Sequence, residues 1–162
     1  MFAPSPSLGW LSLLLVALLV LVPGILGALA SVGLGPFALV PLVPAVILGI
    51  PLLFLAISAP TMRYELDRTT LTLRCGPFLT YRIPLPEVES MQRRDLEVSL
   101  WASLRVPGLA LFTVPYADVG KVKMCATRAA ERIVLIRTAH DLYGVTPTDE
   151  EAFLAAMRSR LA

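Results

Sequence analysis

The pattern of hydrophobic and polar residues divides the chain into two parts that meet near residue 62. The first 62 residues are almost entirely apolar and contain no Asp, Glu, Lys, Arg or His. A membrane-spanning helix needs about 20 apolar residues to cross a hydrocarbon core of about 30 Å. Residues 11–29 and 39–59 each satisfy this length, and the short Gly- and Pro-containing segment 30–36 separates them. We therefore predict a transmembrane hairpin of two antiparallel helices within residues 1–61.

Single residues mark particular positions of this hairpin. Trp10 lies just before the first span, where an aromatic ring is suited to anchor a helix at the membrane–water interface. Pro51 is expected to kink the second helix, which a bilayer helix tolerates. Ala28-Leu29-Ala30 has the small-x-small pattern of a signal-peptide cleavage site, but residues 1–9 lack the positive charge with which such peptides begin. We expect the first helix to be retained; if it were cleaved, the second would still hold the chain in the membrane.

From residue 62 onward, apolar and polar residues alternate with the period of half-buried β-strands. Three short strands with tight turns between them are predicted at the start, over residues 64–66, 71–75 and 79–85. Further strands are expected over 89–96, 119–126, 132–138 and 142–145, with 101–111 as a loop or an irregular strand. Residues 62–162 thus predict one small β-rich domain.

The chain ends in a segment with the signals of an amphipathic helix. Thr146 is the predicted N-cap and Pro147 the first helical residue. Acidic residues fill the expected first turn and basic residues the last, which complements the helix dipole. The apolar stripe of this helix should cover one side of the sheet; its members are Phe153, Leu154, Met157 and Leu161. The predicted fold class is therefore α+β, with six or seven short antiparallel strands capped by one helix.

The distribution of charge separates the two parts and suggests an orientation. All 14 basic and all 12 acidic residues lie at or after Arg63, and the net charge is only +2. This balance argues against a nucleic-acid-binding protein, which usually shows a strongly basic face. Four arginines follow the second span within about 20 residues, whereas the loop between the spans has none. We expect a multi-pass protein of the inner (plasma) membrane with both termini in the cytoplasm.

Two short segments give the soluble part a resemblance to a known family. The stretch Ile83-Pro84-Leu85-Pro86-Glu87-Val88-Glu89-Ser90 is one, and Tyr143-Gly144-Val145-Thr146-Pro147 leading into Glu151-Ala152-Phe153 is the other. Both are similar to the bacterial pleckstrin-homology-like (PH-like) domains, which often follow two membrane helices. The resemblance implies a bent antiparallel β-sandwich or barrel of about seven strands, plugged by the terminal helix. It implies no particular activity, because this fold carries many unrelated ligands.

The sequence contains no recognisable constellation for catalysis, for a metal or for a cofactor. There is no Gly-rich phosphate loop, no GxSxG and no HExxH motif. The one histidine, His140, has no cysteines at zinc-ligand spacing. Cys75 and Cys125 are expected to be two reduced cytoplasmic thiols. We therefore expect a protein that is not an enzyme.

The hypothesis that remains is a membrane-anchored interaction module that presents a protein-binding surface at the inner membrane face. Two alternatives stay open: recognition of anionic lipid headgroups, and an accessory subunit that docks on a membrane complex through the hairpin. Homo-oligomers are also possible. The candidate residues that would face a lipid or a partner are basic, namely Arg63, Arg68, Arg74, Arg93 and Arg94, and the expected capping and core residues are Thr146, Pro147, Phe153 and Met157.

Overall fold

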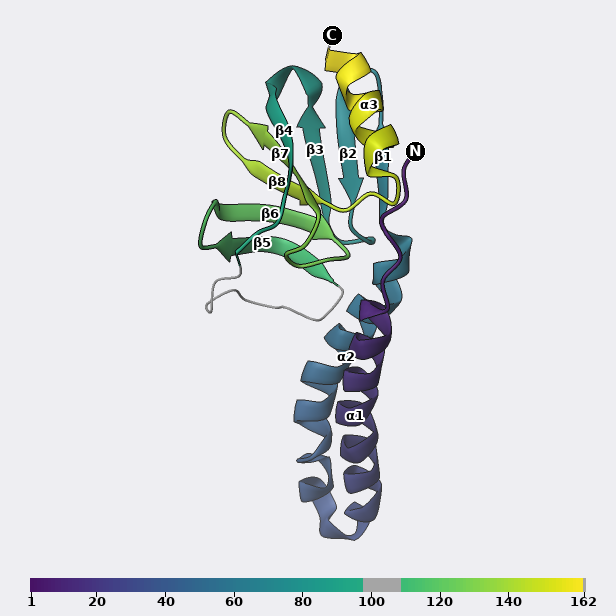
Figure 1. Ribbon diagram of the computed structural model, residues 1–162. Coiled ribbons are helices and arrows are strands. Elements are labelled where there is room, and N and C mark those ends of the chain that lie inside the picture. The colour runs from purple at the N-terminus through teal and green to yellow at the C-terminus, as the bar shows by residue number, and fades with distance from the viewer. Residues whose placement is uncertain (98–108, 162) are drawn as a thin grey trace. The chain divides into compact units, whose positions relative to one another are not determined.

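The computed structural model describes residues 1–97 and 109–161 (Figure 1). The chain forms two compact units. One is Gly9–Pro60, and the other combines Met1–Leu8 with the chain from Thr61 onward. Residues 1–8 were expected with the hairpin, but their backbone pairs with the β-rich unit instead. The predicted fold class, a helical hairpin followed by an α+β domain, is confirmed.

The apolar unit consists of α1 (Gly9–Ala30) and α2 (Leu42–Ser58), which lie antiparallel and side by side (Figure 1). Two segments are long and apolar enough to cross a membrane: Gly9–Ala30, with a mean hydropathy of 2.8, and Leu42–Thr61, which is α2 with the short turn after it, with a mean hydropathy of 2.5. Small residues allow the close approach, because a Cβ atom added at Gly24 would lie 2.1 Å from the Cβ atom of Ala45.

The connection between these helices is longer than predicted. It forms a 3-10 segment, η1 (Val32–Leu39), interrupted at Gly35, whose φ of 66° and ψ of −135° are non-helical. Because the chain turns there, α2 begins at Leu42 rather than at residue 39. A short 3-10 turn, η2 (Ala59–Thr61), follows α2.

The first sheet is the antiparallel meander that the alternation predicts. It contains β1 (Arg63–Leu66), β2 (Thr70–Arg74) and β3 (Thr80–Pro84) in that order. One face packs into the core through Tyr64, Leu71, Leu73 and Ile83, each at most 1% exposed. The other face carries charged and polar side chains, as expected of a sheet with one wet side.

The second sheet follows η3 (Leu85–Glu87) and has the order β4-β7-β8-β6-β5. Its strands are β4 (Val88–Arg94), β5 (Ala110–Tyr116), β6 (Gly120–Ala126), β7 (Ile133–Thr138) and β8 (Leu142–Val145). The described residues thus form eight strands rather than about seven. The additional strand is β5, which begins at the end of the segment 101–111, predicted as a loop or an irregular strand, and extends to Tyr116. Most of that predicted segment, residues 101–108, lies outside the described residues. One neighbouring pair, β6 with β8, is parallel, which departs from the predicted all-antiparallel arrangement.

The terminal helix α3 spans Glu150–Leu161 and begins later than predicted. Asp149 is its cap, since Oδ1 of Asp149 accepts a hydrogen bond of 2.8 Å from the backbone N–H of Ala152. Thr146 does not cap the helix, and Pro147 is not its first residue. The Thr146 hydroxyl is buried in the core and bonds to Thr127 instead.

Candidate binding surfaces

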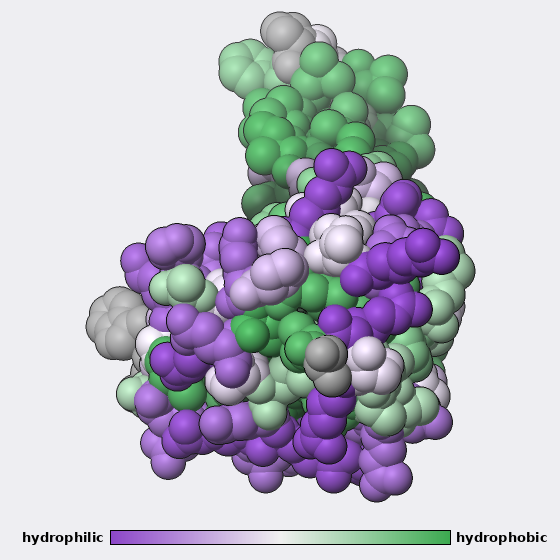
Figure 2. Space-filling model, turned by 90° about the horizontal axis from the view of Figure 1, so that it is seen from above, coloured by the Kyte–Doolittle hydropathy of each residue, from purple (hydrophilic) through white to green (hydrophobic). Residues whose placement is uncertain are grey.

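An open groove lies between the edge strand β4 and helix α3, with a cavity volume of about 520 Å³. The strand contributes Met91 and Arg93. The helix contributes four residues spaced i, i+3, i+4 and i+7, which therefore share one face; they are Glu151, Leu154, Ala155 and Arg158. The groove thus has apolar walls between charged ends. Figure 2 views the end of the domain at which α3 terminates, and apolar residues are exposed there within a frame of hydrophilic ones.

The apolar stripe predicted for α3 divides between this groove and the core. Phe153 and Met157 are fully buried, as the stripe predicts. Leu154 is only partly buried and lines the groove, and Leu161 remains 39% exposed. The stripe is therefore wider than the surface that the sheets cover. The sequence carried this signal as a broad stripe, but only the packing shows which half of it faces solvent.

The first turn of α3 places a buried carboxylate beside the groove. The Glu150 side chain is 6% exposed and lies between two arginines. Its Oε2 is 2.5 Å from Nη2 of Arg93, and its Oε1 is 3.5 Å from Nη2 of Arg132. The position at the positive end of the helix dipole also favours the carboxylate. The Arg93 side chain is itself 46% exposed, but its removal would leave the buried carboxylate with the more distant Arg132 alone, so Arg93 has a structural role as well as a place in the groove.

The strand that forms the other wall, β4, is the last strand of its sheet in the described part of the chain. A bulge at Val88–Ser90 shifts its register against β7. Beyond the bulge, Met91 to Arg94 pair regularly with β7. Bulges and charged residues are the usual protection of an edge against indiscriminate pairing.

The five arginines predicted to face a ligand do not gather in one site. Arg63 and Arg74 are cross-strand partners in the first sheet, and both contact the Glu65 carboxylate, at 3.2 and 3.1 Å. Arg68 lies exposed in the turn between β1 and β2. In the second sheet, Arg93 pairs with Glu150 as above, and Nη2 of Arg94 lies 3.3 Å from Oδ2 of Asp118. The fold therefore distributes these charges over two sheets. Arg82, which was not among the candidates, lies exposed on β3 opposite Thr72 and joins the Arg63–Arg74 face.

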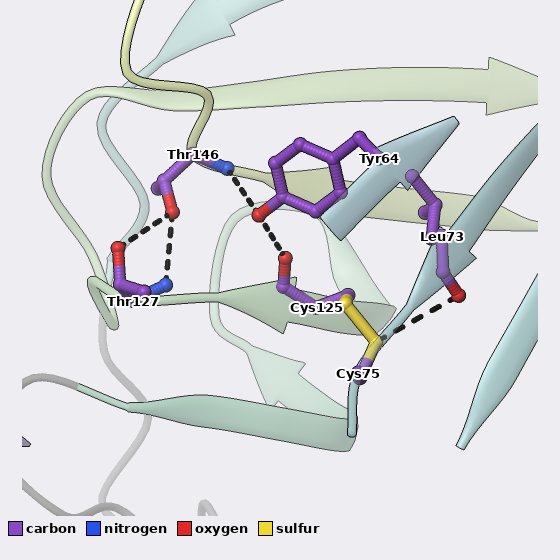
Figure 3. Close-up of a disulfide and its surroundings, with 6 residues drawn as sticks. All are labelled: Tyr64, Leu73, Cys75, Cys125, Thr127 and Thr146. Carbon is purple, nitrogen blue, oxygen red and sulfur yellow. Dashed lines mark hydrogen bonds between the residues drawn. A yellow bond between two sulfur atoms is a disulfide. The ribbon is translucent and has the colours of Figure 1, made fainter. Parts of the chain in front are cut away.

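The interior joins the two sheets through a disulfide and a polar network (Figure 3). Cys75 at the end of the first sheet and Cys125 on β6 are bonded, with their Cα atoms 5.7 Å apart. This corrects the expectation of two reduced thiols. The residues are 50 positions apart in the sequence, so only the packing of one sheet on the other reveals that they meet.

Tyr64 is the centre of the polar network. Its hydroxyl donates a hydrogen bond of 2.7 Å to the carbonyl of Cys125 and accepts one of 3.4 Å from the N–H of Thr146. The Thr146 hydroxyl in turn accepts a bond of 2.8 Å from the N–H of Thr127. Burial raises the pKa of Tyr64 to about 12, although the hydrogen bonds from Thr146 oppose the shift. A neutral phenol with its hydrogen-bonding capacity satisfied is a structural element, so this network belongs to the core rather than to a reactive site.

A second exposed feature is a pair of aromatic rings at the Cys75 end of the domain. Phe78 follows Gly76-Pro77 in the β2–β3 turn, and Phe112 lies on β5. Their rings stack with centroids 6.1 Å apart and are 39% and 43% exposed. Phe112 also adopts a φ of 66°, a conformation that L residues other than glycine seldom adopt.

Within the described ranges, no group of three or more His, Cys, Asp or Glu residues could hold a metal ion. The surface cluster that contains Lys123 is an ion pair of 2.6 Å with Asp141, next to Tyr143. The hydrogen bond and charge of Lys123 lower the pKa of the Asp141 carboxyl. Lys123 lies on β6, an inner strand between β8 and β5, so its charge forms a local ion pair and does not protect a sheet edge.

Comparison with known proteins identifies the β-rich unit. Residues 62–161 match a protein family described as "Bacterial PH domain". No curated protein and no solved structure matches the chain significantly. The match covers more than half of the sequence and includes both sheets and α3. The chain therefore belongs to the bacterial PH domain family.

Proposed function

We propose that this protein is a membrane-anchored interaction module that binds another protein in the groove between β4 and α3. The observation that carries the proposal is the division of the α3 stripe. Phe153 and Met157 already complete the core, yet Leu154 remains in an open groove together with Met91. An apolar centre with a charged rim is the usual anatomy of a protein-binding patch.

The family supports a binding role rather than a catalytic one. PH-like domains generally serve as non-enzymatic binding modules, which agrees with the expectation of no enzymatic activity. The residues that line the groove are Met91, Arg93, Glu151, Leu154, Ala155 and Arg158. That set contains no serine, cysteine or histidine that could act as a nucleophile or a general base near neutral pH.

We also propose that the domain lies at the inner face of the membrane. The support is the placement of Arg63, Arg68, Arg74 and Arg82 directly after α2, since basic residues near a span stay on the cytoplasmic side. The disulfide is the observation that favours the opposite side, because disulfides are rare in the reducing cytoplasm. Basic residues beside a span set its orientation while the chain inserts into the membrane, so the arginines carry more weight than the disulfide in this proposal.

Site-directed photo-crosslinking tests the groove. A photoreactive residue at Glu151, on the rim, should form an adduct with one partner protein in intact membranes, whereas the same residue at Ser159, exposed elsewhere on α3, should not. A matched pair of variants supplies the control. Ala155→Arg places a guanidinium in the groove and should abolish the adduct, while Ala152→Arg, an exposed position outside the groove, should leave it unchanged. Equal adducts from both variants would refute the groove as the binding site.

Anionic lipid headgroups are the second candidate, favoured by the outer face of the first sheet. Arg63, Arg74 and Arg82 lie exposed there, and the Glu65 carboxylate offsets one charge. Each basic residue contributes about 1 kcal/mol at an anionic surface, and recognition usually needs clusters of about 4–8. Three arginines with one carboxylate fall below that range, so we expect weak binding.

The lipid content of native-like membrane discs tests this candidate. The discs are prepared with the unaltered protein and with the Arg74→Glu/Arg82→Glu variant, and the anionic lipid that copurifies with each is measured. Anionic lipid should be enriched only slightly in either. Strong enrichment of one headgroup, lost in the variant, would favour lipid as the ligand. Arg93 is unsuitable for charge reversal, because a carboxylate there would face the buried Glu150.

A further inference from the structure

Residues 1–8, which precede the first apolar helix, form an extended segment docked on the PH domain. Phe2 forms an antiparallel bridge with Tyr64 of β1, and Pro4 forms one with Pro147 in the connection between β8 and α3. The Phe2 bridge consists of two backbone hydrogen bonds of 2.8 and 2.9 Å. Ser5 continues the pairing, since its N–H donates to the carbonyl of Thr146 at 2.7 Å. The segment therefore lies along the edge of β1 and across the connection between β8 and α3.

The side chains of Phe2 and Ser5 pack into the domain. The Phe2 ring packs edge-on against the buried Phe153 ring, with centroids 5.3 Å apart. Ser5 is only 4% exposed, and its hydroxyl lies 2.7 Å from that of Thr127 in the buried polar network. Thr148 holds the segment from the other side, because its hydroxyl donates a hydrogen bond of 2.8 Å to the carbonyl of Pro4.

We propose that this surface is a strand-binding site whose ligand is the chain's own segment Phe2–Ser5, so that the folded domain requires a mature protein that keeps α1. Cleavage after Ala30 would remove the segment with α1. The edge of β1 would then lose its cover, and Thr127 and Thr146 would lose buried hydrogen-bond partners, which is unfavourable. The domain is thus complete only with residues from both sides of the hairpin in the sequence, namely those before α1 and those after α2.

The occupant belongs to the same chain rather than to a second copy. Only three residues separate Ser5 from Gly9, where α1 begins, and β1 begins shortly after η2. Because α1 and α2 are antiparallel neighbours, the start of one and the end of the other lie at the same end of the hairpin (Figure 1). The two flanks therefore meet without a long connection. Two spans with both flanks in one folded unit also require that residues 1–8 and the PH domain lie on the same side of the membrane.

A cysteine cross-link in the full-length protein tests the proposal. The Pro4→Cys/Pro147→Cys variant places two thiols at directly opposed bridge positions, which in an antiparallel pair have Cβ atoms about 4.5–5.5 Å apart. A protease site inserted after Gly33 cuts the chain between the helices. After mild oxidation in membranes and proteolysis in detergent, the two fragments should remain joined until reductant is added. The Cys75–Cys125 bond cannot join them, since both cysteines are in the second fragment.

Three controls make the result decisive. Adding Phe2→Ala should lower the cross-linking rate several-fold, whereas adding Leu8→Ala, at a position 75% exposed, should not change it. Two differently tagged chains, one with Pro4→Cys and one with Pro147→Cys, should not become linked when co-expressed. The intact mass of the purified protein should include residues 2–30. A mature chain that begins after Ala30, fragments that separate, or linkage chiefly between co-expressed chains would each overturn the proposal.

Discussion

Reduction of the Cys75–Cys125 bond should weaken the PH domain strongly, because the bond ties one sheet to the other. Cys75 follows β2 and Cys125 lies in β6, and the two are 1% and 0% exposed. It is the only disulfide within the described residues, and the backbone links the two sheets through η3, between β3 and β4. In the unfolded chain, the cross-link therefore limits how far Cys75 and Cys125 can move apart.

The expected loss follows from the length of the closed loop. For cysteines 50 residues apart, the loop-closure entropy corresponds to about 4 kcal/mol of unfolding free energy at 25 °C. A domain of this size has in total about 5–15 kcal/mol. At a urea m-value of about 2 kcal/mol/M, the unfolding midpoint should fall by about 2 M on reduction.

Urea unfolding of the full-length protein in mild detergent, followed by the near-ultraviolet circular dichroism of its tyrosines, measures this loss with and without reductant. The Cys75→Ala/Cys125→Ala variant is the control. It should unfold near the midpoint of the reduced protein and should not respond to reductant, which separates the cross-link from the packing of two small side chains. Coincident curves for the oxidised and reduced protein would show that the bond does not constrain the unfolded chain.

Three further predictions follow from the core and from the hairpin. Phe153→Ala should lower the unfolding free energy by about 3–5 kcal/mol, because it removes a buried ring that contacts two others; Leu161→Ala, at an exposed position of the same helix, should cost less than about 1 kcal/mol, and equal losses would mean that α3 is only an appendage. The pKa of Tyr64 is raised from 10.0 to about 12 in the folded protein, so the unfolded chain loses this proton first as pH rises. The stabilisation is then complete below pH 10 and is lost between pH 10 and about 12; urea unfolding across this range should show that decline in the unaltered protein and a smaller one in Tyr64→Phe, and identical profiles would contradict the assignment. For topology, a cysteine introduced at Ser31 should react with an impermeant maleimide in intact cells while one at Arg160 should not, and the reverse pattern would place the domain on the outer side; the native cysteines are bonded and do not report on orientation.

Much of this protein follows from local patterns in its sequence. An uncharged stretch long enough for two spans has few alternatives to a hairpin, since backbone groups in a bilayer must be satisfied within a helix. Strict alternation predicted the first three strands, because a strand with one buried face requires it. The burial of Phe153 and Met157 was predictable from the helical period, because an amphipathic helix packs its apolar stripe against the core.

Only the tertiary structure decided the features that depend on distant contacts. Met1–Leu8 was expected to be an uncharged tail that belongs with the hairpin, and nothing local indicates that it pairs with Tyr64 and Pro147. The predicted cap Thr146 became a buried hydrogen-bonding group, because pairing with Thr127 satisfies its hydroxyl in the core, and Asp149 took its place. The disulfide, the parallel β6–β8 pair and the exposure of Leu154 likewise arise where one sheet meets the other or where α3 meets them. A sequence pattern reports which side of an element is apolar, whereas the shape of the assembled partners determines how much of that side they cover.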